Sequence, residues 1–160
     1  VEQGLKEDPK NGVLVLGLGK ILFVEGKYTE ASKKFTQAEA LMPDNDEPVY
    51  YSLMCLVKDK KTDKAMAEAR NALAKFKRSE KIYAALAEAY VIANQYDRAL
   101  KALELSVRIN PMYKDGFLLT AEILHKYMKD SAAAISNYKR YYSLGGNLED
   151  IPQEYRNKLQ

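Results

Sequence analysis

The sequence predicts an all-α protein built as a row of stacked, antiparallel helix pairs. Between Tyr83 and Pro111, apolar and small residues recur at helical spacing in one segment, and again in a second segment after a short polar break. Pro111 also belongs to a frame of about 34 residues, the length of a two-helix repeat, because steps back along the chain reach Lys77, Pro43 and Pro9. Three prolines in one frame indicate an internal repeat, which is typical of helical solenoids.

Composition limits the classes of protein that need to be considered. The chain has 160 residues, of which 47% are hydrophobic and 29% charged, as expected for one globular domain with a core. The net charge of +3 is spread along the chain, so composition favours neither nucleic acid nor an anionic membrane as partner. The single cysteine, Cys55, excludes an internal disulfide framework. The most apolar run, Val13 to Val24, contains Lys20 and is too short to span a membrane.

The chain starts within a repeat. Residues 1–11 are predicted to be a partial repeat, in which residues 1–9 are the end of a second repeat helix, with Leu5 as an apolar contact and Pro9 as its stop. The first helix of that partial repeat would lie upstream, so we expect the natural protein to extend beyond Val1.

The first complete repeat is residues 12–45, with Asn11 as the N-cap of its first helix. Gly19 should let the two helices approach closely, while Phe35 fills the space between this pair and the next. Gly26 lies at the turn, where a positive φ is usual. The apolar and small positions that define the two helices are Val15, Leu18, Gly19 and Leu22, then Tyr28, Ala31, Phe35 and Ala38.

The second repeat, residues 46–79, keeps the 34-residue spacing, but its residues match the repeat pattern less well. Asn45 or Asp46 can cap it, and Lys77 replaces the closing proline. Leu53 stands where a small residue is usual, and Ala69 stands where a large one is usual. We interpret these two as a compensating exchange that conserves core volume.

The third and fourth repeats are residues 80–113 and 114–147. Ser79 is the expected cap of the third. In the fourth repeat, Asp130 or Ser131 is the expected cap of the second helix. The apolar positions of this helix fit the repeat spacing only if one residue is inserted near Lys129. Glycines 145 and 146 should end that helix in a left-handed C-cap.

The last stretch, residues 150–160, is predicted to be a capping helix with Asp150 as its N-cap. Its apolar residues, at four-residue spacing, would cover the end of the fourth repeat, since stacked repeats leave an apolar face open at each end. These residues are Ile151, Tyr155 and Leu159. The tyrosines near this end (Tyr127, Tyr138, Tyr141, Tyr142 and Tyr155) are expected mainly to pack locally, with Tyr142 as a candidate for exposure.

The arrangement of Tyr83, Leu86, Ala87 and Tyr90, followed by Ala99, Leu103 and Pro111, resembles the tetratricopeptide repeat (TPR) family. This resemblance covers nearly the whole chain, as about four and a half repeats plus the capping helix. It implies a right-handed superhelical solenoid forming a single domain, 1–160, as the C-terminal part of a longer protein. It also implies a non-catalytic scaffold that binds a peptide or partner helix in a concave groove lined by the first helix of each repeat, within a multiprotein assembly.

The resemblance places four residues of each repeat on the concave side. Ten of these are the candidate groove residues: Leu16, Lys20, Phe23, Tyr50, Met54, Val57, Lys81, Glu88, Val91 and Glu122. The N-terminal half of this set is apolar, with Phe23, Tyr50 and Met54 as possible anchors, and the groove becomes acidic toward the C-terminus. We therefore expect a partner segment with apolar anchors at one end and basic residues at the other. The alternative is that Phe23 and Met54 only pack between repeats.

Catalysis and cofactor binding are not expected. The glycines before Lys20 do not complete a phosphate-binding motif. The only histidine, His125, has no cysteine cluster with which to form a zinc site, and a solvated or groove-facing position is expected for it. No pair of carboxylates suggests acid–base chemistry. We therefore expect no enzyme activity, no metal and no cofactor.

Two other functions compete with peptide binding. Self-association could occur through a repeat end or through the tyrosine-rich C-terminus, which would make a homo-oligomer. RNA binding is disfavoured because a groove for RNA should be basic, whereas Glu47, Glu88, Asp115 and Glu122 are expected to face inward. The chain is expected to be cytoplasmic and not to insert into a membrane. A periplasmic location, or anchoring through a missing N-terminal part, remains open.

Overall fold

The computed structural model describes residue 8 and residues 10–159, and in these residues the chain forms helices and no strand. The elements in order are α2 (Gly12–Val24), α3 (Tyr28–Leu41), α4 (Glu47–Lys58), α5 (Thr62–Lys75), α6 (Glu80–Ile92), α7 (Tyr96–Ile109), α8 (Lys114–Ile123), the π-helical turn η1 (Leu124–Met128), α9 (Ser131–Ser143), the 3-10 turn η2 (Leu148–Asp150) and α10 (Gln153–Arg156). The partial repeat predicted over residues 1–11, with Leu5 and Pro9, lies almost wholly outside the described residues.

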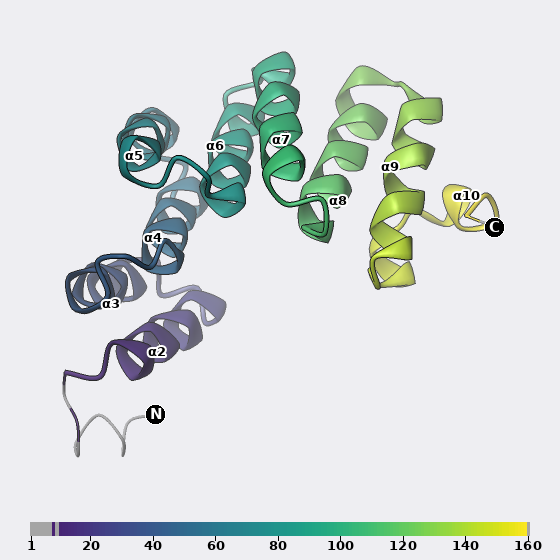
Figure 1. Ribbon diagram of the computed structural model, residues 1–160. Coiled ribbons are helices and arrows are strands. Elements are labelled where there is room, and N and C mark those ends of the chain that lie inside the picture. Colours follow the sequence, from purple (N-terminus) through teal and green to yellow (C-terminus); the bar gives the residue numbers. More distant parts are fainter. Residues whose placement is uncertain (1–7, 9, 160) are drawn as a thin grey trace.

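The helices pack as successive pairs along a curved row (Figure 1). The pairs are α2 with α3, α4 with α5, α6 with α7, and α8 with α9. The first helix of each later pair also packs against the second helix of the pair before it, as α4 does on α3. The predicted all-α solenoid of stacked helix pairs is therefore confirmed.

The second helices keep the sequence frame closely. Helices α3, α5 and α7 begin at Tyr28, Thr62 and Tyr96, which are steps of 34 residues. Helix α5 ends in step with the others although Lys77 stands where they have proline two residues after the helix. Because the position of the helix end survives without the proline, packing against the neighbouring helices sets it.

A residue with positive φ lies in the turn between the two helices of every repeat. These residues are Gly26 (φ 77°), Lys60 (58°), Asn94 (57°) and Lys129 (58°). The first three are spaced 34 residues apart, whereas Lys129 lies 35 residues after Asn94. The π-helical turn absorbs this extra residue, and the N–H of Asp130 bonds the carbonyl of Leu124 at 3.0 Å. The insertion expected near Lys129 thus takes the form of a wider helical turn.

Two glycine substitutions should change stability in opposite directions. A β-carbon at either Gly17 or Gly26 would meet open space, but only Gly26 has a positive φ. Gly17→Ala should raise the free energy of unfolding by about 0.5–1 kcal/mol, because it improves helix propensity in α2. Gly26→Ala should lower it by about 1 kcal/mol, because a β-carbon disfavours the left-handed region. Urea denaturation checks both, and a gain for Gly26→Ala would contradict this account.

Most of the helix caps predicted from the sequence are present in the structure. Asn11, Ser79 and Asp130 each accept a hydrogen bond from a backbone N–H in the first turn of α2, α6 and α9. Before α4, Asn45 accepts the N–H of Glu47 at 2.9 Å, and the position next to the helix, Asp46, makes no side-chain cap bond.

The prediction for the C-terminal capping helix was partly wrong. Asp150 does not cap a helix, since its carboxylate accepts a hydrogen bond from the hydroxyl group of Tyr141 and its backbone belongs to the 3-10 turn. The helix is a single turn, α10, that follows Pro152. Ile151 and Tyr155 are nevertheless buried against the fourth pair. The segment therefore covers the end of the solenoid through side chains and very little helix.

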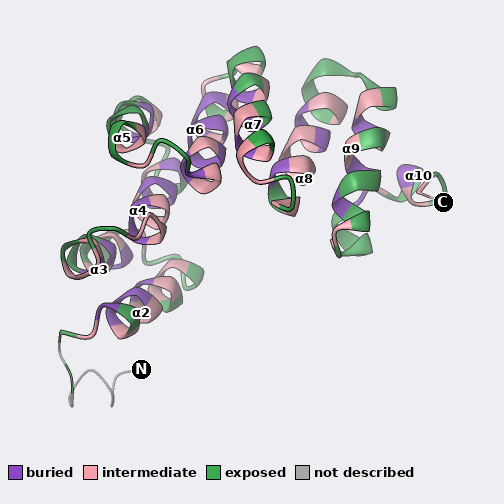
Figure 2. Ribbon diagram, viewed as in Figure 1, coloured by how far each residue is buried: buried purple, intermediate pink, exposed green. Residues whose placement is uncertain are grey.

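Buried side chains gather in three clusters along the row, and the buried residues lie on the packed sides of the helices (Figure 2). One cluster joins the first pair to α4, the next joins α4 through α8, and the third joins α8 and α9 to the terminal segment. Cys55 is 2% exposed in the first of these, where burial raises the pKa of its thiol to about 11. It is a small buried apolar residue.

Candidate partner-binding groove

The candidate groove residues lie on the first helices of the repeats, and α4 contacts both α2 and α6. The structure divides the ten candidate residues into two groups. Three are buried, namely Leu16 (5% exposed), Met54 (4%) and Val57 (1%). The other seven are partly exposed: Lys20, Phe23, Tyr50, Lys81, Glu88, Val91 and Glu122.

Burial removes Met54 from the candidate anchors. Helix α4 is covered by neighbours on both sides, so its apolar residues are used in packing between repeats. Phe23 remains half-buried, with edge-to-face ring contacts to Tyr28 at 5.3 Å and to Tyr51 at 5.7 Å. Tyr50 also remains half-buried. Phe23 and Tyr50 therefore keep aromatic surface that a partner at this end could reach.

Lysines accompany most of the acidic residues of the groove. One oxygen of Glu47 lies 2.7 Å from Lys20 Nζ and 3.8 Å from Lys81 Nζ, so this carboxylate links α2, α4 and α6. Glu88 pairs with Lys58 at 3.6 Å. Lysine ammonium groups therefore partly neutralise the acidic character that the sequence predicted for the groove. Each of these ion pairs also joins neighbouring first helices.

The C-terminal part of the groove has the same pairing. Glu122 lies 3.5 Å from Lys126, and both side chains are partly exposed. The repeat pattern does not assign Lys58 and Lys126 to the groove, because they lie outside the four inward positions of each repeat. Asp115 is exposed and is the groove carboxylate for which the described residues contain no salt bridge.

Two tyrosines from different repeats lie near each other, and only one of them was predicted to line the groove. Tyr50 lies on α4 and Tyr113 lies just before α8, and each phenol affects the pKa of the other. Burial raises the pKa of both phenols, and the nearby carboxylates of Glu88 and Asp115 raise them further. Tyr113 closes the third repeat, a position that the repeat pattern does not assign to the groove.

His125 does not face an open groove. Its Nδ1 lies 2.7 Å from the hydroxyl of Tyr155, and the two rings are edge to face at 5.0 Å. Its Nε2 lies 3.5 Å from the carboxylate of Glu154. The solvated or groove-facing position expected for this histidine was therefore wrong, because the terminal segment packs on it.

Glu88 should make stability depend on pH. Burial raises the pKa of its carboxyl above the usual 4.5, against the opposing effect of Lys58. The folded protein therefore binds this proton more tightly than the unfolded chain does. The stability that this tighter proton binding at Glu88 contributes is complete below pH 4.5 and is lost as pH rises through the raised pKa. In urea denaturation between about pH 4 and 7, Glu88→Gln should flatten the loss of stability with rising pH, and an unchanged slope would contradict the assignment.

Comparison with known proteins places this geometry in a family. A family model of the tetratricopeptide repeat matches residues 56–123, which run from the end of α4 to the end of α8. These residues therefore form tetratricopeptide repeats. A thermophilic TPR protein of Thermus thermophilus, TTC0263, superposes with a TM-score of 0.77 at 22% identity, over 92% of this chain and 80% of that one.

Two longer proteins contain a similar stretch. Protein bimA of Emericella nidulans is 24% identical over 98% of this chain, which spans only 21% of bimA. An O-GlcNAc transferase of Thermobaculum terrenum, as a mutant, superposes with a TM-score of 0.69 at 16% identity over 82% of this chain and 26% of the transferase. Repeats of this kind are therefore found within much larger proteins, one of them an enzyme.

TPR proteins are in general non-catalytic scaffolds for protein–protein interaction, and the family and fold of this chain support that general role. Among the described residues there is no group of three or more His, Cys, Asp or Glu side chains that could hold a metal ion. No described helix is long and apolar enough to cross a bilayer.

Proposed function

We propose that this TPR protein is a non-catalytic adaptor that binds a segment of another protein along its first helices, as part of a multiprotein assembly. The observation that carries the proposal is the set of partly exposed aromatic and charged side chains on α2, α4 and α6, from Phe23 and Tyr50 to Lys81. Aromatic side chains flanked by charges are typical of interface anchors.

The chemistry of this surface narrows the partner. Phe23 and Tyr50 offer apolar contact at the α2–α4 end, while Asp115 offers a carboxylate at the α8 end. A partner segment with apolar side chains at one end and a basic residue at the other would match both. Since Glu88 and Glu122 already lie beside lysines, fewer basic residues are needed than the sequence suggested.

Site-specific photo-crosslinking tests the proposal. A photoreactive amino acid is placed on the groove at Lys81 or Asp115, or on the exposed outer side of the second helices at Thr36 or Glu104. In lysate of the source organism, the groove positions should crosslink one partner that the outer positions do not. Crosslinking from the outer positions alone would contradict groove binding. Phe23→Ala should weaken the groove crosslink while far-UV circular dichroism stays unchanged.

One observation favours self-association as a second candidate. Helix α2 exposes three large apolar side chains, Val13 (69%), Ile21 (45%) and Val24 (86%). An exposed apolar face of this kind could pack on a second copy. Sedimentation measurements over a range of concentrations should then show a dimer that Val13→Ser with Val24→Ser abolishes. A monomer at every concentration would exclude this route.

A further inference from the structure

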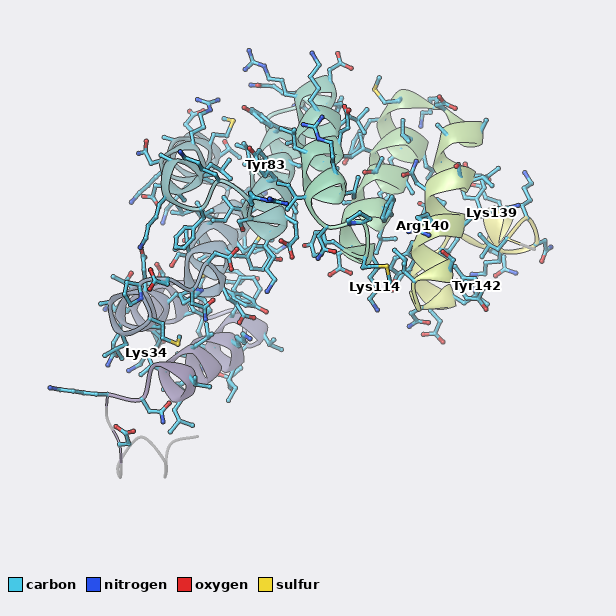
Figure 3. All side chains as sticks on the ribbon, viewed as in Figure 1. Lys34, Tyr83, Lys114, Lys139, Arg140 and Tyr142 are labelled. Carbon is cyan, nitrogen blue, oxygen red and sulfur yellow. The ribbon has the colours of Figure 1, made fainter. Side chains whose placement is uncertain are left out.

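A second surface lies away from the first-helix groove, around the N-terminal half of α7. Two adjacent hollows, of about 590 and 340 Å³, both have Arg98 and Lys101 in their walls. The smaller one lies between α6 and α7 and is mostly apolar, with Tyr83, Tyr90 and Leu105 in its lining. Tyr83 lies on α6 between α5 and α7 (Figure 3). Volumes of this size accommodate a few side chains of a bound segment.

The larger hollow owes its apolar side to the inserted residue of the fourth repeat. The π-helical turn presents Tyr127 (45% exposed) and Met128 (43%) beside the α6–α7 turn. The ring of Tyr127 stacks on that of Tyr96, with centroids 4.3 Å apart and planes 13° apart. Met128 lines the hollow together with Tyr96. Wide turns of this kind often occur at functional sites.

The charge of this surface is available to a partner. Lys101 makes no ion pair or hydrogen bond through its side chain within the described part of the chain, and the guanidinium of Arg98 bonds only the neutral side chain of Gln95, at 2.9 Å. Asp97 is the one carboxylate that lines the larger hollow. Arg98 and Lys101 lie on one face of α7 because they are three residues apart, and Leu105 continues that face.

We propose that the α7 surface, defined by Tyr83, Tyr96, Arg98, Lys101, Leu105 and Met128, docks an acidic segment of a partner protein that carries a large apolar side chain. The apolar side chain occupies the hollows beside Leu105 and Met128, and the carboxylates of the segment pair with Arg98 and Lys101. This charge complementarity selects an acidic partner and rejects a basic one. The α7 surface binds independently of the groove, so one chain can join two proteins.

A subtractive peptide selection tests the α7 surface directly. Phage displaying random short peptides are depleted on the variant Arg98→Glu with Lys101→Glu and then selected on the unaltered chain of residues 1–160. The recovered peptides should combine Asp or Glu with Leu, Met, Phe or Tyr. These peptides are then synthesised, and their binding is measured by fluorescence polarisation. They should bind the double variant at least about tenfold more weakly than the unaltered chain. Recovery of no peptide, or of peptides without acidic residues, would overturn the proposal.

Matched variants separate this surface from general charge effects and from the groove. Lys77→Glu with Arg78→Glu makes the same charge change at positions just after α5 and should leave peptide binding unchanged. Met128→Ser should weaken binding several-fold without loss of helicity, because Met128 is 43% exposed. Equal losses in both charge variants would mean that attraction is non-specific. Phe23→Ala in the groove should have no effect on these peptides, so the two proposals fail separately.

Discussion

Replacing Leu53 with alanine is expected to lower the free energy of unfolding by about 2–5 kcal/mol. Leu53 is 2% exposed in the cluster that joins α4 through α8. Its counterpart in the first repeat is Gly19, where a β-carbon would lie 2.5 Å from the ring of Phe35. By the repeat frame, Leu53 faces Ala69, which is 1% exposed. The large side chain in the second repeat thus comes from α4 and fills space that Phe35 fills in the first.

A double variant tests whether the two residues exchange roles. Ala69→Leu alone should destabilise by about 1–3 kcal/mol, because the new side chain meets Leu53 in a filled core. Leu53→Ala with Ala69→Leu restores the usual order of small and large residues, so its loss should be smaller than the sum of the single losses by about 0.5–3 kcal/mol. Urea denaturation of the four proteins measures this coupling. Additive losses would show that the two side chains do not share one space.

Ile151→Ala is expected to unfold the C-terminal end of the solenoid before the rest. Ile151 is fully buried and packs in one cluster with Tyr138 and Tyr155. Its truncation should cost about 2–5 kcal/mol locally. In a solenoid each repeat is stabilised mainly by its neighbours, so loss of the terminal cover falls first on the last helix pair. Hydrogen exchange should therefore lose protection in α8 and α9 while α4 to α6 keep theirs.

Leu148 provides the matched control for Ile151. It lies three residues earlier in the same terminal segment but is 40% exposed. Leu148→Ala should change protection in α9 very little, since surface substitutions usually alter stability by less than about 0.5 kcal/mol. If both variants lost protection equally, the segment would be sensitive to any change, and burial of Ile151 would not be the cause. Uniform loss of protection from α2 to α9 would contradict the local account.

Much of the fold follows from sequence because the repeat is local. Helix ends, caps and turns recur in a frame, and each depends on residues close together in the chain. The caps at Asn11 and Ser79 and the positive φ at Gly26 confirm this. The insertion near Lys129 was also predictable, because it shifts every later apolar position by one residue.

The groove was less predictable because exposure depends on neighbouring repeats. Met54 and Val57 occupy inward positions of α4 by sequence, yet α6 and α2 cover them. The pairing of Glu47 with both Lys20 and Lys81 joins three repeats, and no spacing within one repeat predicts it. The helical pattern states which face a residue occupies, but the packing of adjacent helices decides how much of that face remains accessible.

The sequence by itself determined the repeat, its length and the succession of helices, because helix periodicity and turn chemistry act over a few residues. Tertiary structure alone decided the terminal segment, where Asp150 bonds Tyr141 instead of capping a helix and Tyr155 covers His125. It also decided that the extra residue becomes a π-helical turn that brings Tyr127 onto Tyr96. These contacts join residues that are distant in sequence, so they depend on how whole helices come to lie together.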